Sequence, residues 1–93
     1  MIRIVATSTV TPETKEQFVK VAKELVEKSR QEAGCISYGL FEDLKNPMEL
    51  AILEEWKDQA AIDFHNAPEH FTTLVPEMSK YRVSSCVTLY KEI

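Results

Sequence analysis

The order in which apolar spacings change along the 93-residue chain restricts its fold more than any other feature. Residues 2–10 are rich in β-branched side chains and contain no glycine or proline, which predicts a strand. Thr11 followed by Pro12 is typical of a helix start, and Gly34 of a helix end. Between them, residues that suit one buried helical face recur every three or four positions: Phe18, Val21, Ala22, Leu25 and Ser29. A strand followed by a long amphipathic helix is therefore expected.

The second half of the chain repeats this order with a hairpin added. Residues 35–43 and 49–57 are predicted to be strands joined by a turn at residues 45–47. Asp58 is expected to cap a short helix over residues 59–65. Asn66, with Glu69 three residues later, is expected to form the capping box of another helix that ends or kinks at Pro76. Residues 83–91 are predicted to be the last strand.

The complete order is β-α-β-β-α-β, which predicts an α+β fold of the ferredoxin-like type. Its four-stranded antiparallel sheet would carry helices on one face only, within a single domain over residues 1–93. Apolar side chains nevertheless occur on both faces of the predicted strands, for instance Ile4 opposite Val5. A sheet that is covered on one side should alternate more cleanly. We therefore expect a homodimer in which two sheets pack together, although scatter in the pattern is the alternative.

Composition excludes several classes of function. The formal net charge is −4 and the basic residues are scattered, so no nucleic-acid partner is expected. No apolar stretch approaches the roughly 20 residues of a membrane helix, and residues 1–6 do not resemble a signal peptide. Cys35 and Cys86 fall in predicted strands and are expected to be buried thiols rather than a disulfide or a metal pair. The chain is therefore expected to be a soluble, cytoplasmic protein without a membrane partner.

The two histidines are the first candidates for chemistry. An imidazole titrates near neutral pH, so His65 could deprotonate a phenol and His70 could donate a hydrogen bond to a ligand. Alternatively, either ring could cap helix carbonyls or pack against Phe71. The histidines are five residues apart across a predicted break and no third ligand is evident, so no metal site is expected.

Strand residues supply the other candidates. Glu54 and Trp56 share one face of their predicted strand. A carboxylate on a largely apolar strand has a raised pKa and suits a general base, or else it forms a salt bridge. Trp56 could stack on a flat aromatic substrate or simply fill the core, and Tyr38 could bind a substrate carbonyl or fill the space inside the sheet. No glycine-rich phosphate loop or nucleophile elbow occurs, so no cofactor is expected.

Two segments of the chain carry motifs of a known family. The first is E-x-W, a short helix, a histidine and then H-[FY], which here spans Glu54 to Phe71. The second is E-x-G-C-x-x-Y, which here spans Glu32 to Tyr38. In both segments the chain resembles the antibiotic biosynthesis monooxygenase family, and the resemblance implies a ferredoxin-like fold, a dimeric α+β barrel and an apolar pocket in each subunit. It also makes Trp56, Tyr38, His70 and Phe71 candidates for substrate binding, and His65 and Glu54 candidates for catalysis.

Members of this family oxygenate aromatic polyketides or quinols with dioxygen and without metal or flavin, so the resemblance implies a monooxygenase acting on a small phenolic or quinol-like aromatic. An isomerase or degradative enzyme for a small sugar-derived autoinducer is an alternative, as is a non-catalytic dimeric module that binds a small hydrophobic ligand. Haem degradation is not expected. His65 aligns with the catalytic tryptophan of the haem-degrading relatives, and about Val75 aligns with their axial histidine. The chain therefore lacks the residue that would ligate the haem iron.

Overall fold

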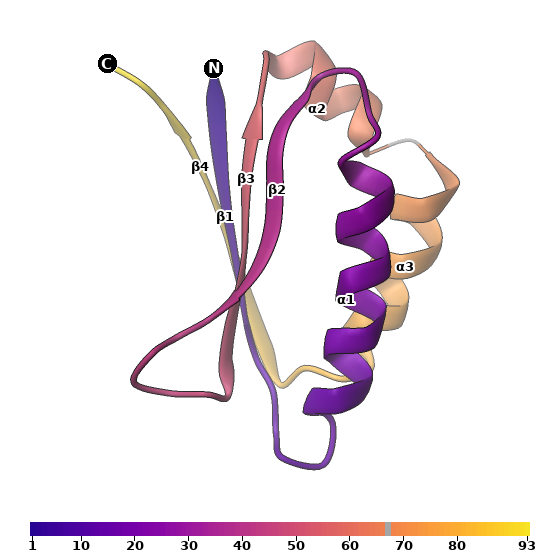
Figure 1. Ribbon diagram of the computed structural model, residues 1–93, viewed down its shortest axis with the longest axis vertical. Coiled ribbons are helices and arrows are strands. Elements are labelled where there is room, and N and C mark those ends of the chain that lie inside the picture. The colour runs from indigo at the N-terminus through magenta and orange to yellow at the C-terminus, as the bar shows by residue number, and fades with distance from the viewer. Residues whose placement is uncertain (67) are drawn as a thin grey trace.

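A computed structural model describes residues 1–66 and 68–93, which form one antiparallel sheet with helices on one side (Figure 1). The elements follow the order β1 (Ile2–Thr9), α1 (Lys15–Ser29), β2 (Cys35–Glu42), β3 (Glu49–Trp56), α2 (Gln59–His65), α3 (Glu69–Ser79) and β4 (Ser84–Lys91). The strands lie in the order β2-β3-β1-β4. The predicted ferredoxin-like α+β fold is thus confirmed.

The helical face of the sheet holds the core. Burial alternates along β3, where Leu50, Ile52, Glu54 and Trp56 are buried beneath the helices. From α1 the side chains of Phe18, Ala22, Leu25, Val26 and Ser29 are buried, close to the predicted face. The period-two pattern of the strands and the helical pattern of α1 therefore meet in one core.

The opposite face of the sheet has no helix over it in Figure 1. Strand register places Val5, Leu53 and Tyr90 on this face, in line with Arg3. Leu53 is 40% exposed and Tyr90 is 55% exposed. Apolar side chains are therefore present on both faces of the sheet, as predicted, and those on this face are exposed.

The ends of α1 differ from the prediction. The helix begins at Lys15 with Thr14 as its N-cap, while the Thr11 carbonyl accepts hydrogen bonds from the amides of Thr14 (3.1 Å) and Lys15 (2.9 Å). Its C-cap is Arg30 rather than Gly34. Gly34 serves another purpose, because a Cβ there would lie 2.3 Å from the Cβ of Ala61 on α2. The glycine permits close approach of α2 to the α1–β2 connection.

The caps of the shorter helices are confirmed in one case and wrong in another. The Asp58 side chain accepts a hydrogen bond from the Ala61 amide at 2.9 Å, as predicted for the start of α2. Asn66 instead ends α2, and Pro68 precedes α3, so the predicted capping box is wrong; Ala67 lies outside the described residues.

Pro76 does not end α3, which continues to Ser79. Leu74 and Met78 are buried on either side of the proline, and this packing offsets the hydrogen bond that proline removes. Both cysteines are free thiols. Cys35 is partly buried, whereas Cys86 is exposed on β4 of the single chain, so its predicted burial is wrong there. Within the described residues, no helix is long and apolar enough to cross a bilayer.

Candidate functional site

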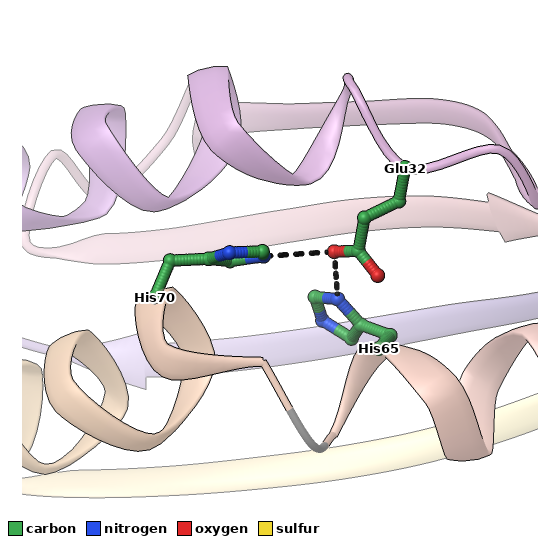
Figure 2. A group of neighbouring side chains, drawn as sticks. All are labelled: Glu32, His65 and His70. Carbon is green, nitrogen blue, oxygen red and sulfur yellow. Dashed lines mark hydrogen bonds and ion pairs between the residues drawn. The ribbon is translucent and has the colours of Figure 1, made fainter.

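Glu32 lies between two histidines from different helices. It belongs to the connection from α1 to β2, whereas His65 is the last residue of α2 and His70 is the second residue of α3. One oxygen of its carboxylate, Oε2, lies 2.7 Å from His65 Nδ1 and 2.9 Å from His70 Nε2 (Figure 2). The Glu32 and His65 side chains are 7% and 3% exposed. These three residues, hereafter the Glu32 triad, form a largely buried hydrogen-bonded group, in which the His70 side chain is 17% exposed.

The carboxylate determines which nitrogen of His65 is available as a base. A carboxylate accepts hydrogen bonds, so Nδ1 carries the proton that it donates to Glu32. The lone pair of the neutral ring is then on Nε2, which has no hydrogen-bond partner among the described residues. Burial lowers the pKa of His65, although the adjacent Glu32 opposes this effect. His65 is therefore a neutral imidazole with a fixed tautomer near pH 7.

A second buried carboxyl group belongs to Glu54, which is 6% exposed. The indole Nε1 of Trp56 donates a hydrogen bond of 2.8 Å to its Oε1. Burial raises the pKa of Glu54 to about 7, and the charge of Glu32 adds to the rise, while the bond from Trp56 opposes it. Near neutral pH this group can therefore both give and accept a proton.

Aromatic rings pack around His65 and hold its orientation. The centroid of the His65 ring lies 4.4 Å from the ring centroid of Trp56, 4.9 Å from that of Phe71 and 5.6 Å from that of Tyr38. Burial is the main cause that raises the pKa of Tyr38, and the charge of Glu54 adds to it, so the phenol stays protonated. The imidazole is thus fixed both by a hydrogen bond and by packing.

A cavity of about 380 Å³ lies between the sheet and the helices next to these groups. His65, Glu54, Tyr38 and Phe71 all line it, as their predicted roles require. The other lining residues are mainly apolar: Ile4, Ala6, Leu25, Ile52, Ile62, Val75, Met78, Val87 and Leu89. A cavity with mostly apolar walls and a few convergent polar groups is the usual form of a small-molecule site.

Trp56 and His70 lie next to the cavity lining and not in it. Trp56 is completely buried and is not among the residues that line the cavity, which agrees with the alternative that it fills the core, where its indole bonds to Glu54. His70 is also absent from the cavity wall and contacts Glu32 instead. Both residues act on the site through a neighbour.

Glu32, and Arg82, which also lines the cavity, are the site residues that the sequence did not indicate. Glu32 occurs in the E-x-G-C segment, but no periodicity connects it to a histidine 33 residues away. It is also a third candidate metal ligand, because its carboxylate and the two imidazoles place ligand atoms within 4.8 Å of one another. The prediction that the two histidines have no third ligand is therefore wrong, while the expectation of a site without metal stays a prediction.

Comparisons with known proteins identify the family of this chain. The family profile "Antibiotic biosynthesis monooxygenase" matches residues 1–77. The chain is 43% identical over 75 residues to "Putative monooxygenase YcnE" of Bacillus subtilis (strain 168), covering 81% of this chain and 79% of that protein.

Solved structures are similar over nearly the whole length. One, described as an antibiotic biosynthesis monooxygenase, has a TM-score of 0.92 and 39% identity and covers 100% of this chain and 99% of its own. A conserved protein from Methanosarcina mazei Go1 has a TM-score of 0.96 and 36% identity, covering 99% and 92%. With the fold, the cavity and these matches in agreement, the chain belongs to the antibiotic biosynthesis monooxygenase family.

Proposed function

We propose that this protein is a monooxygenase that oxidises a small phenolic or quinol-like aromatic with dioxygen, without metal or flavin. The observation that carries the proposal is the neutral imidazole of His65, which Glu32 holds in one tautomer on the wall of an apolar cavity. A phenol becomes reactive toward dioxygen when it loses its proton. The family membership supports the same class of reaction.

In the first step His65 Nε2 takes the phenolic proton, and Glu32 stabilises the imidazolium that forms. The phenolate then transfers electrons to dioxygen, and a carbon–oxygen bond gives a ring-bound peroxide. The apolar walls exclude water from this intermediate. Tyr38 and Phe71 border the ring of the substrate in this arrangement.

Glu54 completes the reaction as an acid. Because its pKa is about 7, a large fraction carries a proton at neutral pH. It protonates the outer peroxide oxygen as the oxygen–oxygen bond breaks, and that oxygen leaves as water after the His65 imidazolium gives it the second proton. The ring carbon loses its hydrogen as a proton to the Glu54 carboxylate and becomes a carbonyl, so both residues return to their starting states. One oxygen atom of dioxygen is thus retained in a quinone and the other is released as water.

The test is oxygen uptake by metal-stripped protein with a panel of hydroquinones and polyphenols. Protein-dependent uptake with an oxygenated product is expected, and His65→Ala should reduce it at least about 100-fold, within the range for general acid–base catalysis. His70→Ala should reduce it less than His65→Ala does, because His70 contacts the same carboxylate but does not line the cavity. Oxygen uptake that survives loss of His65 would remove this residue from the mechanism.

An isomerase or degradative enzyme for a sugar-derived autoinducer is the second candidate. The observation in its favour is that Glu54 and His65, an acid and a base, line one cavity and could move a proton between two carbons. Turnover of such a ligand under nitrogen would identify this function. A binding module, by contrast, would bind its ligand without product and without dependence on either histidine.

We further propose that the protein works as a homodimer through the uncovered face of the sheet. This face carries the partly exposed Leu53 and Tyr90 and a hollow of about 630 Å³ whose walls include Val5 and Phe41. An exposed apolar patch of this kind marks an interaction site in a small protein. A second copy would also cover the thiol of Cys86.

A further inference from the structure

Arg82 brings an unneutralised positive charge to the cavity. It lies between α3 and β4, and it is the only lysine or arginine among the described residues that line the cavity. Its hydrogen bonds go to two hydroxyl groups, from Nη1 to Ser8 Oγ at 3.4 Å and from Nη2 to Ser79 Oγ at 3.2 Å. No carboxylate of the described residues lies within ion-pair distance of it.

This arrangement leaves most of the guanidinium available to a ligand. The group has five N–H donors in a planar fork that fits a carboxylate with two parallel hydrogen bonds. Two long bonds to neutral hydroxyls use only part of this capacity. In a partly buried site with apolar walls, an anion on the ligand would gain more from this charge than it would at an open surface.

The strand register separates Arg82 from the proposed reacting groups. Ser8, which contacts Arg82, and Ile4, which pairs with Glu54, are four residues apart on β1. A strand rises about 3.3 Å per residue, so these two levels lie roughly 13 Å apart. An aromatic molecule of two or three fused rings with substituents at opposite ends would extend along this distance.

We propose that Arg82 forms an anion-binding subsite, and that the substrate is a phenol or quinol whose far end carries a carboxylate or a similar anionic group. The inference rests on the proposed function, because it takes Glu54 and His65 as the reacting end of the cavity. It narrows the substrate class from small aromatics in general to elongated, anionic ones.

The test compares two ligands that differ only in the anion. 6-Hydroxy-2-naphthoate carries a phenol and a carboxylate at opposite ends, and 2-naphthol lacks the carboxylate. Isothermal titration at pH 7 under nitrogen should show the naphthoate binding at least about tenfold more tightly to the unaltered protein. Arg82→Gln should remove this preference and leave the affinity for 2-naphthol unchanged, and Arg82→Lys should keep part of it.

Lys80→Gln is the matched control, because Lys80 is exposed, pairs with Glu77 at 2.8 Å and does not line the cavity. It should keep the full preference. Equal affinity for the two ligands, failure of both to bind, or a preference that survives Arg82→Gln would each overturn the subsite. Oxygen uptake is measured separately. If it is absent while the preference and its dependence on Arg82 persist, the monooxygenase proposal fails and the subsite stands.

Discussion

The carboxylate of Glu32 lies 2.7 Å from Nδ1 of His65, so a residue from the α1–β2 connection determines the tautomer of a base at the end of α2. The same oxygen lies 2.9 Å from His70 Nε2. Three separate elements therefore meet at one carboxylate oxygen. The other oxygen, Oε1, is buried without a hydrogen-bond partner among the described residues. A buried polar atom without a partner lowers the stability of the fold.

Replacing Glu32 tests whether this carboxylate positions His65. Glu32→Gln keeps the shape but removes the charge, and we expect kcat/KM to fall about 10- to 100-fold because the imidazolium loses its partner. The ¹⁵N chemical shifts of the imidazole should show a mixture of tautomers in the variant and a single tautomer in the unaltered protein. Glu24→Gln, on the exposed face of α1, is the control. A single tautomer and full activity in Glu32→Gln would contradict the assignment.

The pH dependence of kcat/KM distinguishes the two candidate bases. Burial lowers the pKa of His65 below its ordinary value of 6.5, so the neutral base persists into mildly acidic solution. Because Glu54 must carry the proton that it donates, we expect activity to fall as pH rises through about 7, and on the acidic side to fall only below pH 6.5, where His65 takes up a proton. If Glu54 were the base, activity would rise with pH through about 7, the pKa of its carboxyl group. Such a rise, absent in Glu54→Gln, would transfer the role to Glu54.

Glu54 also determines how stability depends on pH. Its pKa of about 7 in the folded protein exceeds the ordinary 4.5, so the folded state binds this proton more tightly than the unfolded state. Its contribution to stability is complete below pH 4.5 and is lost as pH rises through 7. Glu54→Gln should therefore raise the free energy of unfolding at pH 8 by up to about 3 kcal/mol and change it little at pH 4.

Urea unfolding at the two pH values measures this difference. Glu42→Gln is the control, because Glu42 ends β2, is exposed and pairs with Lys15. It should change stability by less than about 1 kcal/mol at either pH. An equal effect of both substitutions would mean that burial does not raise the pKa of Glu54.

The elements were predictable because their patterns are local. Alternation along β3, the three- and four-residue spacing in α1, and the Asp58 cap each depend on residues close together in sequence. The predicted candidates His65 and Glu54 do line one cavity. The hydrogen bond between Glu32 and His65 could not be predicted from a local pattern, because the two residues come together only when α1 and α2 pack against one sheet. The same holds for Gly34, which resembled a helix end but is a point of close approach.

That close approach can be tested by substitution. Gly34→Ala would place a Cβ 2.3 Å from the Cβ of Ala61, and overpacking of this kind costs about 1–3 kcal/mol. Gly39→Ala is the comparison, because its new Cβ would meet at 2.8 Å the ring of Phe41, an exposed side chain that can move aside. Thermal unfolding should show the larger loss for Gly34→Ala. Adding Ala61→Gly should recover part of it, and no recovery would show that the strain lies elsewhere.

The proposed dimer predicts a response to charge on the uncovered face of the sheet. Leu53 is 40% exposed there, so in an isolated subunit Leu53→Asp should change stability only slightly. In a dimer that packs two sheets together, the same substitution would bury two unpaired carboxylates and should give monomers. Sedimentation equilibrium measures the mass, and Leu44→Asp, in the exposed β2–β3 connection, is the control. A monomeric unaltered protein, or a Leu53→Asp variant that stays dimeric, would place any interface on another surface.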